Sequence, residues 1–343
     1  MSDPSTAGGV FVQTNEARNR VVAFARSDEG LLDSIEWYET GGAGDATPHL
    51  PSQGSVSLTG DGGHLLVTNV GSGDVSVFTV LPDATLELAG RAPAAAVPRS
   101  VAEHHGLVYV LATGKAAVIG YRLVEDRLQP IAGGEQSLAT LDADPAHIGF
   151  TPDGSALIVT ERGTDTIAVL PVDADGRAGA PHSVASSGPT PYGFAATSTG
   201  TLVVTEAYRA EKGAAAASSY RLDGTAVTPV TRSAGNGRSE ICWAVVTPDD
   251  QWAFTTNFAD GAVSRYAIGD DGSLVLDDAT AGVTVDGRKG LRDLGMSADG
   301  RYLYALDADA GSVFGWDVGP GGSLEPAGSW GGLPATAAGL SAR

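Results

Sequence analysis

A short motif that recurs along this chain constrains its fold more than any other feature. The motif ends in a tight polar turn of the Asp-Gly type, and successive turns end at positions 62, 106, 154, 200, 250 and 300. Each turn precedes an alternating apolar run, such as HLLVTN or ALIVTE, and then a second turn and a second run. Period-2 alternation bounded by Gly, Asp and Asn is the signature of β-strands. A repeat of this length predicts four strands per unit, which is the blade of a β-propeller.

The two ends of the chain together complete the ring. Residues 8–15, 21–26 and 34–39 supply three strands of a first blade but no inner strand, whereas residues 335–342 align with the inner-strand segment 293–300. The sequence therefore predicts an all-β, seven-bladed propeller with four antiparallel strands per blade. The C-terminal strand should close the ring by entering the N-terminal blade, because closure removes the exposed sheet edges.

Composition agrees with one propeller domain over residues 1–343, of which residues 1–8 are expected to form a disordered N-terminal tail. Gly (47) and Pro (18) make up about a fifth of the chain, as many short strands and tight turns require. Neither an apolar run of membrane-spanning length nor a secretion signal is visible, so we expect a soluble, cytoplasmic protein. The single cysteine, Cys242, excludes an internal disulfide.

The formal net charge of −20 repels phosphates and anionic lipids, so we expect neither nucleic acid nor membrane as a partner. The expected partner is a small-molecule substrate, and the expected assembly is a monomer or a weak homodimer.

One face of a propeller collects the loops that enter the inner strands and the turns between the next two strands. About half of the 21 Lys and Arg residues map to this face of an otherwise acidic protein. Arginine suits fork-like binding of carboxylate or phosphate, which predicts a small anionic or oxygen-rich ligand. The candidate substrate-binding residues on this face are Arg99, Arg292, Tyr192, Gln53, Trp243 and Arg18. Packing between blades would explain Tyr192 and Trp243 equally well.

His147, Glu161 and Glu206 are the candidate catalytic residues. A histidine near a carboxylate can act as a general base toward water, and His147 begins an inner strand beside the strand that Glu161 ends. The alternative for His147 is a channel histidine bonded to the backbone. Glutamate is a poorer turn former than Asn or Asp, which occupy the corresponding positions of other blades. Those residues are interpreted as structural: Asn15, Asn69, Asn257 and Asp307.

No cofactor or metal is expected. The sequence contains no HExxH, no GxSxG and no phosphate-binding glycine loop. Pieces of the Asp-x-Asp type lack the following ligands of a calcium loop.

The blade signatures TPDG (151–154) and SADG (297–300), with the segments 69–78, 145–169 and 239–257, resemble the lactonase-type seven-bladed propeller family. That family includes bacterial 6-phosphogluconolactonase and fungal carboxymuconate lactonizing enzyme. The resemblance implies that the family's histidine, glutamate and basic residue fall on His147, Glu161 and Arg292. The segments Pro51-Ser52-Gln53 and Pro98-Arg99-Ser100 replace histidine-containing segments of the family, which implies a different substrate or a loss of catalysis.

Three functions are therefore compatible with the sequence. The first is a metal-independent lactone hydrolase, or an enzyme of the reverse cyclisation, in which His147 activates water and Arg99 and Arg292 hold the substrate in the central channel. The second is a non-catalytic propeller that binds a small ligand or a partner protein. The third is a metal-dependent lactonase with oxygen ligands from Glu161, Glu206, Asn257 and Asp307.

Overall fold

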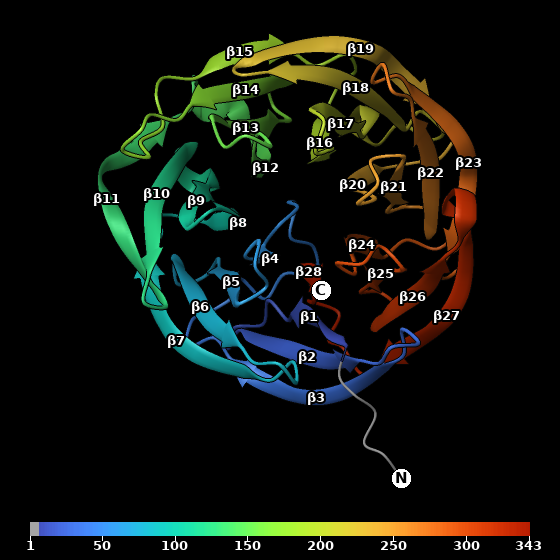
Figure 1. Cartoon of the computed structure of the whole chain (residues 1–343), viewed down its shortest axis with the longest axis horizontal. Coiled ribbons are helices and arrows are strands. Elements are labelled where there is room, and N and C mark those ends of the chain that lie inside the picture. The colour runs from blue at the N-terminus through green and yellow to red at the C-terminus, as the bar shows by residue number, and fades with distance from the viewer. Residues whose placement is uncertain (1–6) are drawn as a thin grey trace.

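The computed structural model describes residues 7–343, except for the side chains of residues 34 and 35, and forms a ring of seven four-stranded sheets (Figure 1). All neighbouring strands within a sheet are antiparallel, and each sheet runs from an inner strand at the channel to an outer strand at the rim. The predicted seven-bladed, all-β propeller is confirmed. Between residues 7 and 343 there is no α-helix, and thus no helix long and apolar enough to cross a membrane.

The blades follow one another along the chain. The first three blades contain β28 (Leu340–Ala342), β1 (Gly8–Gln13), β2 (Arg20–Arg26) and β3 (Leu32–Glu39); β4 (Val56–Leu58), β5 (His64–Asn69), β6 (Asp74–Val80) and β7 (Leu86–Pro93); β8 (Pro98–His104), β9 (Leu107–Ala112), β10 (Ala117–Val124) and β11 (Arg127–Ser137).

The other four contain β12 (Pro145–Phe150), β13 (Ala156–Glu161), β14 (Thr166–Pro171) and β15 (His182–Ala185); β16 (Pro191–Ala196), β17 (Thr201–Glu206), β18 (Ala216–Asp223) and β19 (Ala226–Gly235); β20 (Ile241–Val246), β21 (Trp252–Asn257), β22 (Ala262–Ile268) and β23 (Leu274–Val283); β24 (Leu291–Met296), β25 (Tyr302–Asp307), β26 (Ser312–Val318) and β27 (Leu324–Gly331).

Burial explains why the strands differ in sequence. A second strand is covered on both faces by the adjacent blades, so β13 is buried at all six positions and reads as a nearly continuous apolar run, ALIVTE. The outer strand β19 has one face toward water and alternates between exposed and partly buried residues.

The recurring Asp-Gly turn joins each inner strand to its second strand. In the fourth blade, Thr151 Oγ1 donates to Asp153 Oδ1 (2.7 Å) and the Gly154 amide donates to the Thr151 carbonyl (2.8 Å). Gly154 has φ +70°, a conformation that favours glycine. The hydrogen bonds that Asp153 accepts from Thr151 and Ser155 lower the pKa of its carboxyl, so the turn is stabilised by an ionised aspartate.

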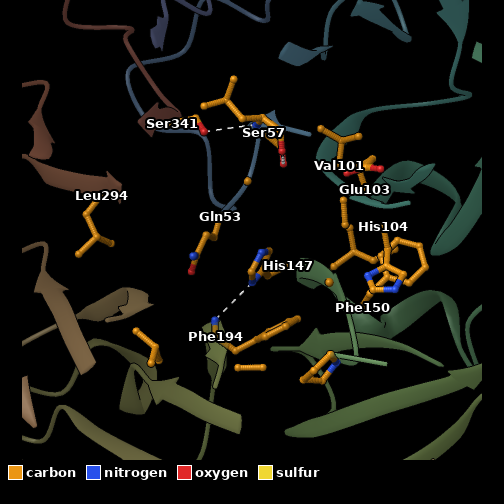
Figure 2. A pocket seen from close by; sticks show the side chains of 18 of the residues that line it. Gln53, Ser57, Val101, Glu103, His104, His147, Phe150, Phe194, Leu294 and Ser341 are labelled. Carbon is orange, nitrogen blue, oxygen red and sulfur yellow. Dashed lines mark hydrogen bonds between the residues drawn. The ribbon is translucent and has the colours of Figure 1, made fainter. Parts of the chain in front are cut away.

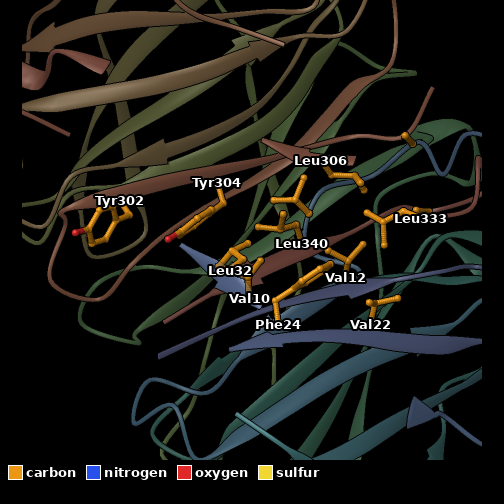
Figure 3. Packing of buried hydrophobic residues seen from close by; sticks show 13 residues of the cluster. Val10, Val12, Val22, Phe24, Leu32, Tyr302, Tyr304, Leu306, Leu333 and Leu340 are labelled. Atoms are coloured by element: carbon orange, nitrogen blue, oxygen red, sulfur yellow. The ribbon is translucent and has the colours of Figure 1, made fainter. Parts of the chain in front are cut away.

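The ring closes where the two ends of the chain pair. Strand β28 pairs with β1 in the register Val10–Ala342, Phe11–Ser341 and Val12–Leu340. The buried side chains around this seam come from the first and the last blade (Figure 3) and include Val10, Val12, Tyr304, Leu306 and Leu340. The predicted closure is confirmed, although the strand is shorter than the segment 335–342. Of the predicted tail, residues 1–6 lie outside the described residues, and Gly8 already belongs to β1.

We expect Leu340→Ala to lower the free energy of unfolding by about 2–5 kcal/mol, because it removes buried methyl groups at the seam. Leu340 is 3% exposed, whereas Ala335 in the same C-terminal segment is exposed and offers a matched control, Ala335→Ser. Chemical denaturation of both variants measures the difference. Equal stability of the two variants would contradict a contribution of this seam to the free energy of unfolding.

Candidate functional site

Five inner strands carry a β-bulge close to their first residue. In β8 the register passes from Pro98–Ala112 to Ser100–Leu111, so one residue has no partner on β9. Strands β12, β16, β20 and β24 shift register at the equivalent place. The residues inside the five bulges are Arg99, Ala146, Tyr192 with Gly193, Cys242, and Arg292 with Asp293. A bulge removes a residue from the ladder and redirects its side chain.

The bulges help to bring arginines together at the end of the channel where the inner strands begin, which we call the strand-entry mouth. Arg99, Arg162 and Arg292 form an arginine cluster that spans three blades. The Arg162 guanidinium lies 5.0 Å from the centroid of the Tyr192 ring. Tyr192 also lies within electrostatic range of Arg99 and Arg292, so these predicted substrate-binding residues do share one site.

The arginine cluster is only partly neutralised. Arg162 pairs with Asp144 (2.8 Å), and Arg292 lies 3.5 Å from Asp309 while donating to the Ala337 carbonyl (2.7 Å). Arg99 takes part in none of the ion pairs found between residues 7 and 343.

Several buried polar atoms in this region lack a hydrogen-bond partner within the described part of the chain. They are Arg99 Nε, Arg292 Nε, Tyr192 Oη and Thr336 Oγ1. A buried donor without an acceptor costs about 1–3 kcal/mol. Burial also lowers the pKa of both guanidinium groups, and a bound anion would offset the cost of burying these cations.

His49 belongs to the same mouth and was not singled out by the sequence. Its ring lies 5.0 Å from the Phe258 ring. Desolvation, followed by the positive charges of Arg292, Arg162 and Arg99, lowers the pKa of His49 to about 4, so its imidazole is neutral at physiological pH. Its loop carries no strand pattern, which is why the sequence offered no signal for it.

The segment from Leu50 to Gly54 crosses the channel, and Figure 1 shows the chain before β4 reaching into the centre of the ring. Gln53 Nε2 donates to the Ala244 carbonyl (2.9 Å), and Trp243 Nε1 donates to the Ser52 carbonyl (2.9 Å). The Ser52 hydroxyl donates to the Arg99 carbonyl (2.8 Å). We call this segment the plug. Gln53 and Trp243, both predicted to bind substrate, make its cross-channel hydrogen bonds.

A cavity of about 730 Å³ occupies the channel on the other side of the plug (Figure 2). It extends from Gln53 and Gly54 to the ends of the inner strands, where Pro152, Ser198 and Pro248 of the Asp-Gly-type turns line it. We call this opening the turn mouth. The arginine cluster does not line this cavity.

His147 lies in the turn-mouth cavity, apart from the arginine cluster. The bulged residue of β12 is Ala146, so His147 falls one position beyond the place that Arg99 and Arg292 take in their strands. His147 Nδ1 accepts a hydrogen bond from the Phe194 amide (3.3 Å), and its ring lies 4.2 Å from the Phe194 ring. Burial lowers the pKa of His147 to about 3, so the ring is neutral and carries its hydrogen on Nε2.

Glu161 does not support His147 through any hydrogen bond in the described residues. Glu161 Oε2 accepts from Thr164 (2.9 Å) and Thr166 (2.6 Å), whereas its Oε1 is buried without a partner. The predicted contact between His147 and Glu161 is therefore not formed. The histidine instead accepts from the Phe194 amide, and the glutamate accepts from two threonines.

Glu206 links its own blade through hydrogen bonds to the segment that follows the preceding blade. It accepts hydrogen bonds from Ser218 (2.6 Å), Ser233 (2.7 Å) and the amide of Gly188 (2.8 Å), which follows the preceding blade. Burial raises its pKa. The sequence distinguished Glu206 from Asn69, but both residues end a second strand and perform the same structural task.

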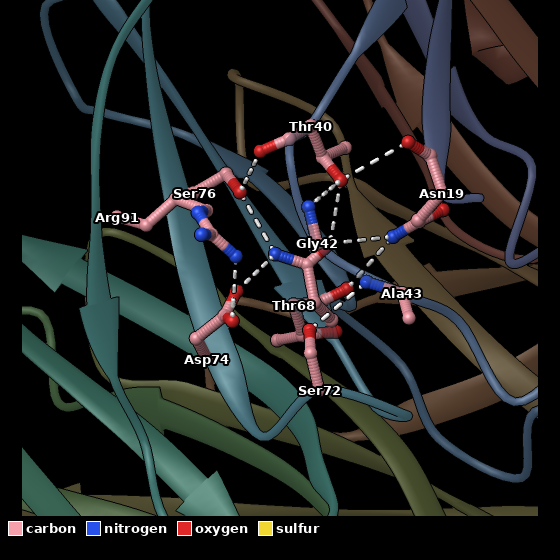
Figure 4. A network of polar contacts seen from close by, with 10 residues as sticks. Asn19, Thr40, Gly42, Ala43, Thr68, Ser72, Asp74, Ser76 and Arg91 are labelled. Atoms are coloured by element: carbon pink, nitrogen blue, oxygen red, sulfur yellow. Dashed lines mark hydrogen bonds and ion pairs between the residues drawn. The ribbon is translucent and has the colours of Figure 1, made fainter. Parts of the chain in front are cut away.

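Figure 4 shows the polar network in which the labelled side chains of Asn19, Thr40 and Ser76 take part. Asn69 Oδ1 accepts from Asn19 and Thr40 of the first blade (both 2.8 Å), and its Nδ2 donates to Asp74 (2.6 Å) and Ser76 (2.8 Å) of its own blade. Asn257 and Asp307 make equivalent links, through Asn236 and Thr284. The four proposed metal ligands thus end strands of four separate blades. Within residues 7–343, no group of three or more His, Cys, Asp or Glu is placed to hold an ion.

Arg18 lies away from the strand-entry mouth, whereas the thiol of Cys242 lies within electrostatic range of Tyr192 and Arg162 at that mouth. Arg18 is exposed and pairs with Glu39 (2.7 Å) at the outer rim, so the structure does not bring it to the arginine cluster. Cys242 is buried, donates to the Glu240 carbonyl (3.3 Å), and has a pKa raised by burial, which leaves the thiol protonated.

Residues 126–210 match the family model described as "Lactonase, 7-bladed beta-propeller". The resemblance to the lactonase-type propeller family is therefore confirmed. The 6-phosphogluconolactonase of Yersinia pestis (strain Pestoides F) is 24% identical over 225 residues, which cover 64% of this chain and 65% of the relative. The alignment thus spans about two thirds of the length of the curated relatives.

Solved structures show the same fold at low identity. A candidate 6-phosphogluconolactonase of Bacteroides fragilis superposes with a TM-score of 0.76 at 15% identity, covering 100% of this chain and 99% of the other. The periplasmic gluconolactonase of Pseudomonas aeruginosa gives a TM-score of 0.69 at 13% identity, with 98% of each chain covered. At these identities the similarity establishes the architecture alone.

Asp293 lies at the floor of the turn-mouth cavity, and the pH dependence of protein stability tests how strongly burial raises its pKa. Desolvation raises its pKa to about 7, and its carboxylate accepts from the amides of Leu294 (3.1 Å) and Gly54 (3.4 Å). Between pH 4 and 7 the folded state then binds more protons than the unfolded state, so this group's contribution to stability falls as pH rises. Asp293→Asn should remove a decline on the order of 3 kcal/mol across that range.

Urea denaturation of wild type, Asp293→Asn and the exposed control Asp286→Asn at pH 4, 5.5 and 7 checks this expectation. Parallel pH profiles for wild type and Asp293→Asn would contradict it.

Proposed function

We propose that this protein hydrolyses the lactone of a small anionic sugar acid at the strand-entry mouth, without a metal ion, and that the same groups can serve the reverse cyclisation. The observation that carries the proposal is the arginine cluster, in which three guanidinium groups from three blades meet beside buried donors that lack acceptors. The class of substrate is supported by the relatives named 6-phosphogluconolactonase and gluconolactonase.

Arg99 and Arg292 would hold the anionic group of the substrate. Each guanidinium can donate two parallel hydrogen bonds to a carboxylate or phosphate. The unpartnered hydroxyl of Tyr192 would donate a further bond to a substrate oxygen. Fixing the charged end in this way places the lactone ring next to the remaining groups of the mouth.

His49 is the group at this mouth best suited to activate water. Its neutral imidazole would accept a proton from water while the water oxygen attacks the lactone carbonyl carbon. Arg162 would stabilise the negative charge that develops on the carbonyl oxygen. The ring C–O bond then breaks, the departing oxygen takes the proton from the imidazolium, and the new carboxyl group loses its proton to solvent.

Substitution of the arginines tests substrate binding. We expect Arg99→Ala to lower kcat/KM for 6-phosphogluconolactone by about 100-fold or more, since a lost charged anchor or oxyanion donor has effects of that size. Uncharged gluconolactone should be affected much less. Arg292→Lys, which keeps the charge near Asp309, complements Arg292→Ala in case the alanine variant is unstable.

The exposed Arg18→Ala is the matched control, and its turnover should equal that of wild type. Undiminished turnover in both the Arg99 and Arg292 variants would reject the proposed anion site. Saturable binding of the lactone without any turnover by wild type would instead favour the non-catalytic alternative.

A second set of variants separates His49 from the sequence-predicted base. We expect His49→Ala to lower kcat by about 100-fold or more, and His147→Ala to leave it within a few-fold of wild type. The acid limb of the kcat/KM profile should lie near pH 4, the pKa of His49 in the free protein, because protonation there removes the base. Loss of activity only in His147→Ala, or an acid limb near pH 6.5, would contradict the assignment.

A further inference from the structure

The turn-mouth cavity is a second compartment of the channel that the proposed hydrolysis does not use. Its volume of about 730 Å³ falls within the range of small-molecule sites. The plug separates it from the arginine cluster, and the hydrogen bonds of Gln53 to β20 hold the plug in place.

The charge of this compartment is opposite to that of the strand-entry mouth. Glu103, Asp250 and Asp293 line it, and no lysine or arginine among residues 7–343 does so. The carboxylates of Glu103 and Asp250 are fixed by hydrogen bonds from the Gly106 amide and from Ser198. Ionised turn aspartates such as Asp153 surround the same end of the ring. Such a field attracts cations and repels anions.

Aromatic and apolar side chains supply the remaining wall. Phe150 and Phe194 both line the cavity, and Figure 2 shows them on the same side as His147. The ring of His147 contacts the ring of Phe194 at an interplanar angle of 41°, and a neutral His147 adds no positive charge. Ring faces are favourable neighbours for a cation, and they also cover an apolar group.

Asp293 offers a carboxylate at the floor of the cavity. It is 3% exposed and belongs to the bulge of β24 beside Arg292, yet it lines the compartment opposite to the arginine cluster. The amides of Leu294 and Gly54 donate to this carboxylate, but these hydrogen bonds offset only part of the cost of burying it. His147, the other titratable group at this depth, stays neutral, so Asp293 has no cationic partner of its own in the cavity.

We infer that the turn-mouth cavity binds a small organic cation that carries an apolar or aromatic group, with its ammonium group directed to Asp293 and its apolar part against Phe150 and Phe194. This inference is independent of lactone hydrolysis, because it concerns the other side of the plug.

Three probes of one shape test the inference: benzylamine, benzyl alcohol and benzoate, titrated calorimetrically into the full chain at pH 8. We expect benzylamine to bind at least about tenfold more tightly than the other two, the difference that a buried charge-assisted hydrogen bond supplies. Asp293→Asn should weaken benzylamine at least about tenfold and leave benzyl alcohol within about twofold.

Ala196→Trp fills the cavity from its wall without changing any charge, so it should abolish benzylamine binding. Ala196→Trp also tests binding in the cavity if the Asp293→Asn variant does not fold. Equal affinity for the three probes, or benzylamine affinity unchanged in Ala196→Trp, would overturn the inference, the latter by showing that the amine binds only to the acidic surface. Neither outcome would bear on lactone turnover at the strand-entry mouth.

Discussion

The antiparallel pairing of β1 with β28 is the interaction on which the rest of this structure depends. It supplies the inner strand of the first blade, so that seven inner strands surround one channel and the inner edge of β1 is paired. The seam is apolar, and the side chains of Val12, Tyr304 and Leu340 fill it. Arg99 and Arg292 come from blades that are far apart in sequence, and they meet only because the ring is closed.

Two local structural features create the candidate binding sites within this ring. The first is the bulge at the start of five inner strands, which takes Arg99 and Arg292 out of their ladders and leaves them at the strand-entry mouth. The second is the plug, whose Gln53 and Ser52 bond to the opposite side of the channel. Together they divide the channel into a basic mouth with unpartnered donors and an acidic cavity with aromatic walls. A rigid scaffold with different chemistry at its two ends can serve two ligands of opposite charge.

The sequence predicted the architecture well because the repeat, the turn chemistry and the burial pattern are all local and recur in every blade. Arg99, Tyr192 and Arg292 were also predicted, since a loop that enters an inner strand must open at the same end of the ring. His147 shows where this reasoning fails: a one-residue bulge at Ala146 sends the histidine to the other compartment, and the period-2 pattern does not reveal a bulge. The hydrogen-bond partners of Glu206 could not be predicted, since Ser218 and Ser233 lie on strands whose pairing the sequence does not specify residue by residue.

His49 and the plug lay beyond prediction for a related reason. Gln53 was predicted to face the channel, but the segment before β4 has no strand period, and its position is decided by contacts with Ala244, Trp243 and Arg99 of other blades. Long-range contacts of this kind are set by the closed ring and not by the local sequence.

The most direct test of the proposed site is a crystal structure of the protein with 6-phosphogluconate, the acid that the proposed hydrolysis would release. We expect the acid at the strand-entry mouth, with its phosphate or carboxylate contacting Arg99 and Arg292 and its remaining oxygens near Tyr192 and His49. Density for the acid in the turn-mouth cavity beside His147, or no density at the arginine cluster at saturating concentration, would contradict it.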